Sequence, residues 1–247
     1  MKVKSVETLL DLGIRINSLN NLRGSLLCET PVSLQCNIFG SCVVGAFTYT
    51  GRGSMKNTRV GRYCSIADVD FLSGYVHPLD RTTTHPLTYN GTRQFDFYPG
   101  YHEITQRHLM RYKNPVNTGE LQLHIGNDVW IASNVKIVKP VVIGNGVVVA
   151  ACSLVNKDIH SYEVSAGVPA KFIKHRLDPQ LIETLNACPW WNLDLSCAES
   201  GLLGDPEKYV EWASIGSNYL QAPWLDTKCW SLKRVKDEIF IEEIASI

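Results

Sequence analysis

The chain has 247 residues, enough for one large domain with appended segments. Lysine plus arginine and aspartate plus glutamate number 24 each, so the formal net charge is zero and no basic surface predicts nucleic acid as a partner. The apolar share is 45%, but no apolar run reaches the length of a membrane span, so we expect no membrane partner.

Residues 1–30 predict an N-terminal cap with a short helix around Ser5–Leu12 and a strand around Gly24–Cys28. Charged residues interrupt the apolar stretch of this segment, so it does not have the pattern of a secretory signal. The eight cysteines of the chain include no CxxC pair, which predicts reduced, buried thiols. We therefore expect a cytoplasmic protein.

A first, irregular set of six-residue repeats begins in residues 31–72. Apolar β-branched residues head these repeats at Ile38, Val44, Val60 and Ile66. The phase breaks between Tyr49 and Arg59, which predicts a loop or a bulged corner there.

The segment 73–120 breaks the repeat completely and holds four of the seven histidines. Loops of this length inside a compact repeat are usually functional or disordered, and the aromatic content argues against disorder. We expect an excursion that leaves the coil and covers an active site. Its aromatic side chains predict either the wall of an acceptor pocket or packing within the excursion: Tyr75, Tyr89, Phe95, Phe97, Tyr98 and Tyr101.

The regular repeats run from Ile125 to His160, in six consecutive sixes without a gap. The first residue of each six is Ile or Val, and the fifth is apolar or small. A period of six fits neither a helix nor a plain alternating strand, but it fits short strands joined by tight corners. Stacked turns of this kind bury one continuous apolar column. The alternative, a single buried strand or an ordinary sandwich, does not account for six repeats in phase.

Residues 178–247 predict a C-terminal helical segment and extension. Asp178 followed by Pro179 is typical of a helix N-terminus. Pro206–Ser214 and Ser231–Ile244 are further candidate helices, which we expect to cover coil surface or a neighbouring subunit.

The six-residue pattern, with VHPLD at 76–80, THP at 84–86 and AGVPAKFIKHR at 166–176, resembles the hexapeptide-repeat acyltransferases. The resemblance is to the xenobiotic acyltransferase branch, which includes streptogramin and type-B chloramphenicol acetyltransferases. It implies an all-β fold, a left-handed parallel β-helix over 31–177 with the excursion at 73–120. It also implies a homotrimer and acetyl transfer from acetyl-CoA to a hydroxyl group of a small molecule or sugar, with an amino group as the alternative.

The resemblance implies that His77 is the general base, because the first histidine of this stretch has that role in the branch. A neutral imidazole can accept the proton of the acceptor while that atom attacks the thioester directly, in a ternary complex. His85 falls on a second position of the motif, and whether it assists is open. A loop histidine is otherwise usually a surface or packing residue, and this alternative also stays open.

The resemblance also implies a set of acetyl-CoA contacts. In galactoside-type relatives the matching residues contact the cofactor, and they fall here on Ser133, Ala151, Asn156, Lys157, Lys171 and Lys174. Trp130 falls on the tryptophan of the family's V-W-I-G stretch, for which the resemblance implies packing beside the cofactor. The lysines would meet phosphates, whereas for Trp130 a structural role is equally open. Two departures are Asn156 in place of Thr and Cys152 in place of Gly, and Cys152 narrows the expected groove.

Two other functions are compatible with a six-residue coil. A γ-type carbonic anhydrase shares it, but that metal lyase needs three histidines on the coil walls to hold zinc. The regular repeats here carry only His124 and His160, near their two ends, so we expect no metal. A non-catalytic scaffold is the third possibility, and the intact HP…THP and GVPAK segments argue against it.

Overall fold

The computed structural model describes residues 1–72, 77–89, 95, 97–98, 100–110, 123–138 and 140–247. The chain forms two units, of which the first comprises 1–72 with 119–247 and the second comprises 73–118. The first unit is a β-coil with its terminal segments, and the second is the excursion.

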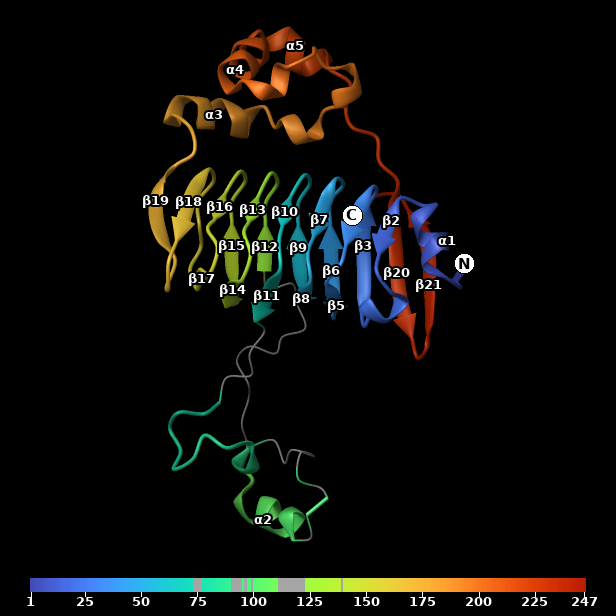
Figure 1. Cartoon of the computed structure of the whole chain (residues 1–247), viewed down its shortest axis with the longest axis vertical. Coiled ribbons are helices and arrows are strands. Elements are labelled where there is room, and N and C mark those ends of the chain that lie inside the picture. The colour runs from blue at the N-terminus through green and yellow to red at the C-terminus, as the bar shows by residue number, and fades with distance from the viewer. Residues whose placement is uncertain (73–76, 90–94, 96, 99, 111–122, 139) are drawn as a thin grey trace. The chain divides into compact units, whose positions relative to one another are not determined.

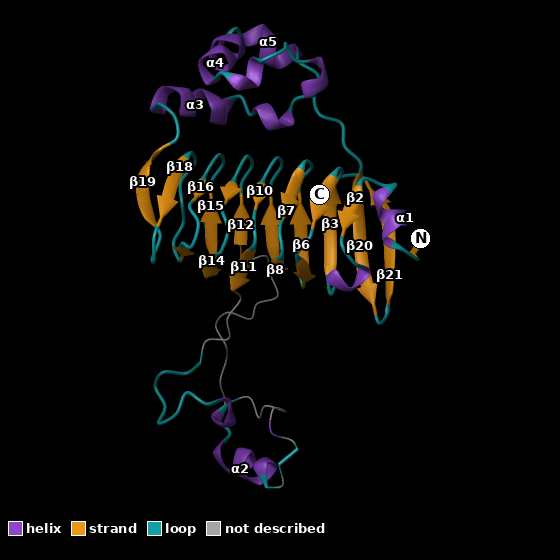
Figure 2. Cartoon of the chain, viewed as in Figure 1, coloured by secondary structure: helices purple, strands orange, loops and turns teal. Residues whose placement is uncertain are grey.

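Three sheets build the coil (Figure 1 and Figure 2). Sheet A contains, in spatial order, β1 (Lys2–Val3), β21 (Glu238–Ile244), β20 (Cys229–Val235), β3 (Ser25–Glu29), β6 (Ser41–Val44), β9 (Thr58–Val60), β12 (Leu123–Ile125) and β15 (Val141–Ile143). Sheet B contains β19 (Lys171–His175), β18 (Glu163–Ala166), β16 (Val148–Val149), β13 (Trp130–Ile131), β10 (Ser65–Ile66), β7 (Thr48–Thr50), β4 (Val32–Leu34) and β2 (Ile14–Ile16). Sheet C contains β17 (Leu154–Val155), β14 (Val135–Val138), β11 (Val69–Leu72), β8 (Gly53–Lys56) and β5 (Asn37–Phe39).

Each full turn of the coil visits sheets A, B and C in that order, and strands of successive turns pair in parallel. Leu123 pairs with Val141, eighteen residues later, so one regular turn equals three hexapeptides. The first and fifth residues of the sixes between 125 and 160 all point inward and are at most 6% exposed. Burying one such aliphatic side chain contributes about 1.5–3 kcal/mol. The predicted parallel β-helix is therefore confirmed.

Glycines occupy the corner between sheets A and B, which we call the A-to-B corner. Gly61, Gly126 and Gly144 stand there in successive turns. A Cβ atom at Gly126 would lie 2.8 Å from the backbone nitrogen of Asn145 in the next turn. Glycine is required at this position because the backbones of adjacent turns touch.

Of the loop or bulged corner predicted between Tyr49 and Arg59, the loop is wrong, because β8 continues the coil through this stretch. Its Met55 side chain points into the core and is 1% exposed. The repeat loses its phase because this turn is shorter than a regular one. Val43 pairs with Arg59, only sixteen residues later.

The N-terminal end of the coil is closed by segments from both chain ends. Helix α1 (Val6–Leu10) follows Ser5, as predicted, and strands β2 and β3 pair with β4 and β6 of the coil. From the other end of the sequence, β20 pairs antiparallel with β3, β21 with β20, and β1 with β21. Sheet A therefore ends in a hairpin rather than in an open coil strand.

The candidate helix over Ser231–Ile244 is wrong, since this segment forms β20 and β21. Burial alternates along both strands: Leu232 is buried and Lys233 exposed, and Ile239 and Ile241 are buried on either side of the exposed Phe240. This period of two is the pattern of a half-buried antiparallel strand.

The other predicted C-terminal helices form. Helix α3 (Pro179–Ala187) begins after Asp178, whose carboxylate accepts a hydrogen bond from the Gln180 N–H at 2.9 Å. Helices α4 (Pro206–Ser214) and α5 (Gly216–Gln221) follow, after the short 3-10 turns Trp190–Asn192, Leu195–Cys197 and Leu202–Gly204. These elements share a second apolar cluster with Tyr162 of the coil.

The second unit contains a 3-10 turn at Pro86–Thr88 and helix α2 (Tyr101–His108). All eight cysteines of the chain are free; five are buried, and Cys152 and Cys197 are exposed. Among the described residues, no helix has the length and apolar character needed to cross a membrane.

Candidate active site

The corner between sheets B and C carries a column of small residues, which we call the B-to-C corner. Ser133 and Ala151 occupy it in successive turns, and the Cys152 N–H donates to the Ser133 carbonyl oxygen at 3.0 Å. In the next turn the Gly167 carbonyl oxygen accepts from the Leu154 N–H at 3.0 Å. Ser133, Ala151 and Gly167 are all exposed. Small side chains therefore leave a line of backbone accessible along the coil.

The outer face of sheet B extends from the strand before this corner to the basic segment 171–176. Trp130 pairs in register with Val148, which pairs in turn with Val164. Val164 pairs with Lys174 of β19, so Trp130 and Lys174 lie in one row of the sheet, about 14 Å apart at the usual strand spacing. Lys171 lies on the same strand, and both lysines are exposed. Trp130 itself is 54% exposed.

Asn156 and Lys157 lie at a different corner. They follow β17 and occupy the turn from sheet C to sheet A, where both are exposed. Strand β17 separates them from Ala151. The predicted cofactor residues thus divide into three groups on the later turns of the coil: the B-to-C corner, the outer face of sheet B, and the C-to-A corner.

The sequence predicts a groove of small residues beside basic side chains that are free to bind phosphates. Cys152 and Arg176 differ from this expectation. Cys152 is exposed and has φ 60°, the left-handed conformation that glycine adopts without strain. The Arg176 side chain is already bonded within the coil, because its Nη1 donates to Asp128 Oδ2 at 3.0 Å and to the Gly146 carbonyl oxygen at 2.8 Å. The burial of Asp128 raises the pKa of its carboxyl, against the opposing effect of Arg176.

His77 lies in the second unit and is exposed. Its Nδ1 lies 2.7 Å from the Thr84 carbonyl oxygen. A carbonyl oxygen only accepts hydrogen bonds, so this contact assigns the proton to Nδ1 and leaves Nε2 as the acceptor in the neutral ring. The ring also meets the Tyr89 ring edge-on, at 5.8 Å between centroids. Two contacts from the 84–89 segment therefore fix the orientation of His77.

His85 has a structural contact. Its Nδ1 accepts a hydrogen bond from the Leu87 N–H at 3.2 Å at the start of the 3-10 turn. Phe95 lies 5.9 Å from the His85 ring and 5.2 Å from that of Tyr101. Part of the aromatic set predicted from the sequence is thus packing within the excursion, while Tyr75 lies outside the described residues. Within the described chain, no three His, Cys, Asp or Glu side chains form a group able to hold a metal ion.

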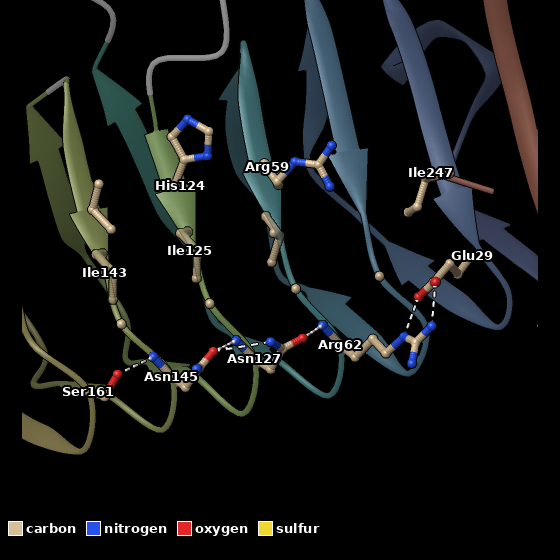
Figure 3. A pocket seen from close by; sticks show the side chains of 16 residues that line it. Glu29, Arg59, Arg62, His124, Ile125, Asn127, Ile143, Asn145, Ser161 and Ile247 are labelled. Carbon is tan, nitrogen blue, oxygen red and sulfur yellow. Dashed lines mark hydrogen bonds and ion pairs between the residues drawn. The ribbon is translucent and has the colours of Figure 1, made fainter. Parts of the chain in front are cut away.

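A polar ladder that was not predicted from the sequence lies at the A-to-B corner (Figure 3). The Asn127 side-chain oxygen accepts from the Arg62 N–H at 2.8 Å, and that of Asn145 accepts from the Asn127 N–H at 2.9 Å. The Asn145 N–H donates to Ser161 Oγ at 3.2 Å. The signal for this ladder was the recurring Gly-Asn dipeptide at 126–127 and 144–145.

The ladder ends in a buried ion pair. Arg62 donates through Nε and Nη2 to the two Glu29 carboxylate oxygens, each at 2.6 Å (Figure 3). Arg62 Nη1 also donates to Asn192 Oδ1 at 3.0 Å, in the C-terminal segment. Burial acts to raise the pKa of Glu29, but the bonds from Arg62 and from the Ala46 N–H outweigh it, so the pKa lies below its ordinary value.

A hollow of about 470 Å³ lies beside this ladder, on the outer face of sheet A. Arg59, His124 and Ile247 are among the residues that line it. Figure 3 shows His124 and Arg59 on neighbouring strands. No residue of the hollow belongs to the set predicted for acetyl transfer.

A coil of hexapeptide turns with an exposed corner of small residues defines the class of hexapeptide-repeat transferases. Residues 123–157 match the family described as bacterial transferase hexapeptide (six repeats). A probable macrolide acetyltransferase of Lysinibacillus sphaericus is 35% identical over 162 residues, which cover 61% of this chain and 82% of that protein. The chain therefore belongs to the hexapeptide-repeat acetyltransferases, in the xenobiotic acetyltransferase branch.

Other relatives agree over shorter parts. A chloramphenicol acetyltransferase of Klebsiella aerogenes is 44% identical over 152 residues, 60% of this chain and 66% of that protein, so the chain spans just under two thirds of this relative. The solved structure of the polySia-specific acetyltransferase NeuO is 20% identical, with a TM-score of 0.43, over 76% of this chain and 72% of that one. This structural similarity is too low to bear on function. The protein is an acetyltransferase by its sequence relatives.

Proposed function

We propose that this acetyltransferase uses acetyl-CoA as donor and His77 as general base to acetylate a hydroxyl group of a small molecule or sugar. The observation that carries the proposal is the 2.7 Å contact between His77 Nδ1 and the Thr84 carbonyl oxygen. It leaves Nε2 with a lone pair on an exposed ring, which is what a base for an external substrate needs.

The chemistry follows from that lone pair. Nε2 takes the hydroxyl proton while the acceptor oxygen attacks the thioester carbon. The C–S bond then breaks, and the departing thiolate takes the proton back from the imidazolium, so that the ring returns to its neutral form. No covalent acyl-enzyme is required. An amino acceptor would react in the same way.

The end of the coil is suited to acetyl-CoA. The pantetheine arm carries amides, and the B-to-C corner offers accessible backbone beside Ser133 and Ala151. The phosphates need cations, and Lys171, Lys174 and Lys157 are exposed and lie on the last turns. Asn156 and Trp130 complete the proposed contacts.

A homotrimer is part of the proposal. Trp130, Phe172 and Ile173 are each more than half exposed on the outside of the coil, which supports a covering subunit. The relatives named above are a macrolide and a chloramphenicol acetyltransferase, so an antibiotic-like alcohol is a natural first acceptor to test. We propose that the enzyme acts in the cytoplasm, where acetyl-CoA is available.

The function can be tested by following thiol release from acetyl-CoA with a panel of macrolides, chloramphenicol and galactosides. We expect acceptor-dependent release and an O-acetylated product by mass spectrometry. The double variant Lys171→Gln/Lys174→Gln should raise the KM for acetyl-CoA roughly tenfold with little change in kcat, because two phosphate contacts of exposed lysines, at about 0.7 kcal/mol each, amount to about 1.4 kcal/mol.

Lys4→Gln is the matched control, since Lys4 is an exposed lysine near the opposite end of the coil. An unchanged KM in the double variant would remove the two lysines from the proposed site. Failure of the protein to bind acetyl-CoA at millimolar concentration would contradict the proposed donor.

A further inference from the structure

We infer that the hollow on the outer face of sheet A is a second binding site, which takes an oxyanion of a small molecule, either a phosphate ester or a carboxylate, through Arg59 and His124. The hollow measures about 470 Å³, large enough for a small metabolite. This inference goes beyond the proposed acetyl transfer and stands on residues that the transfer does not use.

Strand register places the two residues at neighbouring positions of sheet A. Arg59 of β9 pairs with His124 of β12, so both project outward from neighbouring strands about 4.8 Å apart. Both are exposed, and the buried Val60 and Ile125 that follow them keep this alternation (Figure 3). The coil is rigid here because each strand pairs on both sides within sheet A. An oxyanion can therefore meet two donors whose spacing is fixed before it binds.

Glu29 lies close enough for the charge of Arg59 to contribute to its lowered pKa, but no ion pair joins the two side chains. Among the described residues, the side chains of Arg59 and His124 form neither a hydrogen bond nor an ion pair. Glu29, which also lines the hollow, is already occupied by two bonds from Arg62 and one from the Ala46 N–H. A guanidinium and an imidazole at paired positions, next to a carboxylate whose oxygens are already bonded, favour an added anion.

The floor of the hollow is open backbone. Gly61 and Gly126 line it and carry no side chain that could fill it, and a Cβ at either would strike the next turn of the coil. The outward neighbour of His124 in register is Val142, which is 51% exposed and offers an apolar wall. Charged donors on one side and an apolar wall on the other fit a small organic anion.

The site is separate from the proposed transfer residues within the first unit. Ser133 and Ala151 lie at the B-to-C corner, and Lys171 and Lys174 lie on β19 of sheet B. Arg59 and His124 lie on sheet A. A ligand in the hollow therefore does not replace acetyl-CoA on those residues.

Titration calorimetry at low ionic strength tests the inference, with inorganic phosphate in one arm and citrate in the other. We expect binding of at least one of them, weakened roughly tenfold by Arg59→Gln and also by His124→Gln, since each removes one charge-assisted donor. Lys233→Gln is the control, because Lys233 is an exposed cation on β20 of the same sheet but outside the hollow. Circular dichroism confirms that the variants are folded.

Equal affinity in Arg59→Gln and the unchanged protein would overturn the site, as would the absence of binding to both anions at millimolar concentration. The third decisive outcome is competition. We expect saturating acetyl-CoA to leave anion binding in place, and complete displacement would assign the anion to the cofactor site instead. The relative strength of phosphate and citrate then identifies which class of oxyanion the hollow prefers.

Discussion

Arg62 joins two segments that lie far from it in the sequence. Its guanidinium reaches from the third turn of the coil to Glu29 in the first and to Asn192 in the C-terminal segment. The side chains of Arg62 and Glu29 are 21% and 11% exposed, so the pair is largely removed from water. In such a place a charge without its partner is costly.

Glu29→Gln should therefore lower the free energy of unfolding by about 3–5 kcal/mol at neutral pH, because Arg62 loses its counter-charge in a largely buried site. Since the folded-state pKa of Glu29 is lowered, the ion pair stabilises fully above the pKa of the unfolded carboxyl and is lost as pH falls through the lower folded pKa. Urea unfolding at several pH values in the acidic range measures this, and the variant should have a flatter profile.

Glu29→Gln combined with Arg62→Met provides the control, because removing both charges should cost less than removing one. Identical pH profiles for Glu29→Gln and the unchanged protein would show that the ion pair does not stabilise the fold.

The C-terminal hairpin determines how the coil ends. Strands β20 and β21 extend sheet A beyond β3, so the first coil strand is not left as an open edge. An open strand at this place would offer unpaired N–H and C=O groups to other chains. Leu232 on β20 pairs with Leu26 of β3 and is 1% exposed, as part of the main core.

Leu232→Ala should destabilise the protein by about 2–5 kcal/mol, the usual cost of a cavity in a packed core. The neighbouring Lys233→Ala should change the free energy of unfolding by less than about 0.5 kcal/mol, because Lys233 is exposed on the same strand. Chemical unfolding followed by circular dichroism compares the two. If Leu232→Ala were as mild as Lys233→Ala, the hairpin would not belong to the cooperative core of the coil.

At the scale of the molecule, the sequence predicts those features of the fold that depend on the six-residue period. The period identifies the residues that point inward. It also predicts that Ser133 and Ala151 lie next to each other in successive turns, because they are eighteen residues apart and one regular turn has eighteen residues. The Glu29–Arg62 ion pair could not be predicted from this period, because the two residues are 33 positions apart and the coil between them has a turn of only sixteen residues. The hairpin was missed because its strand β20 pairs with β3, some 200 residues earlier, and local pattern carries no information about such a partner.

The central claim is that His77 removes the acceptor proton while the coil holds acetyl-CoA. Its most direct test compares His77→Ala with the unchanged protein, measuring both kcat and the Kd for acetyl-CoA. His102→Ala serves as control, since His102 belongs to the same excursion and its ring forms a hydrogen bond with Gln106. We predict that His77→Ala lowers kcat by about 10²–10⁴-fold, the usual contribution of a general base, with an unchanged Kd. A near-normal kcat in His77→Ala would contradict the account.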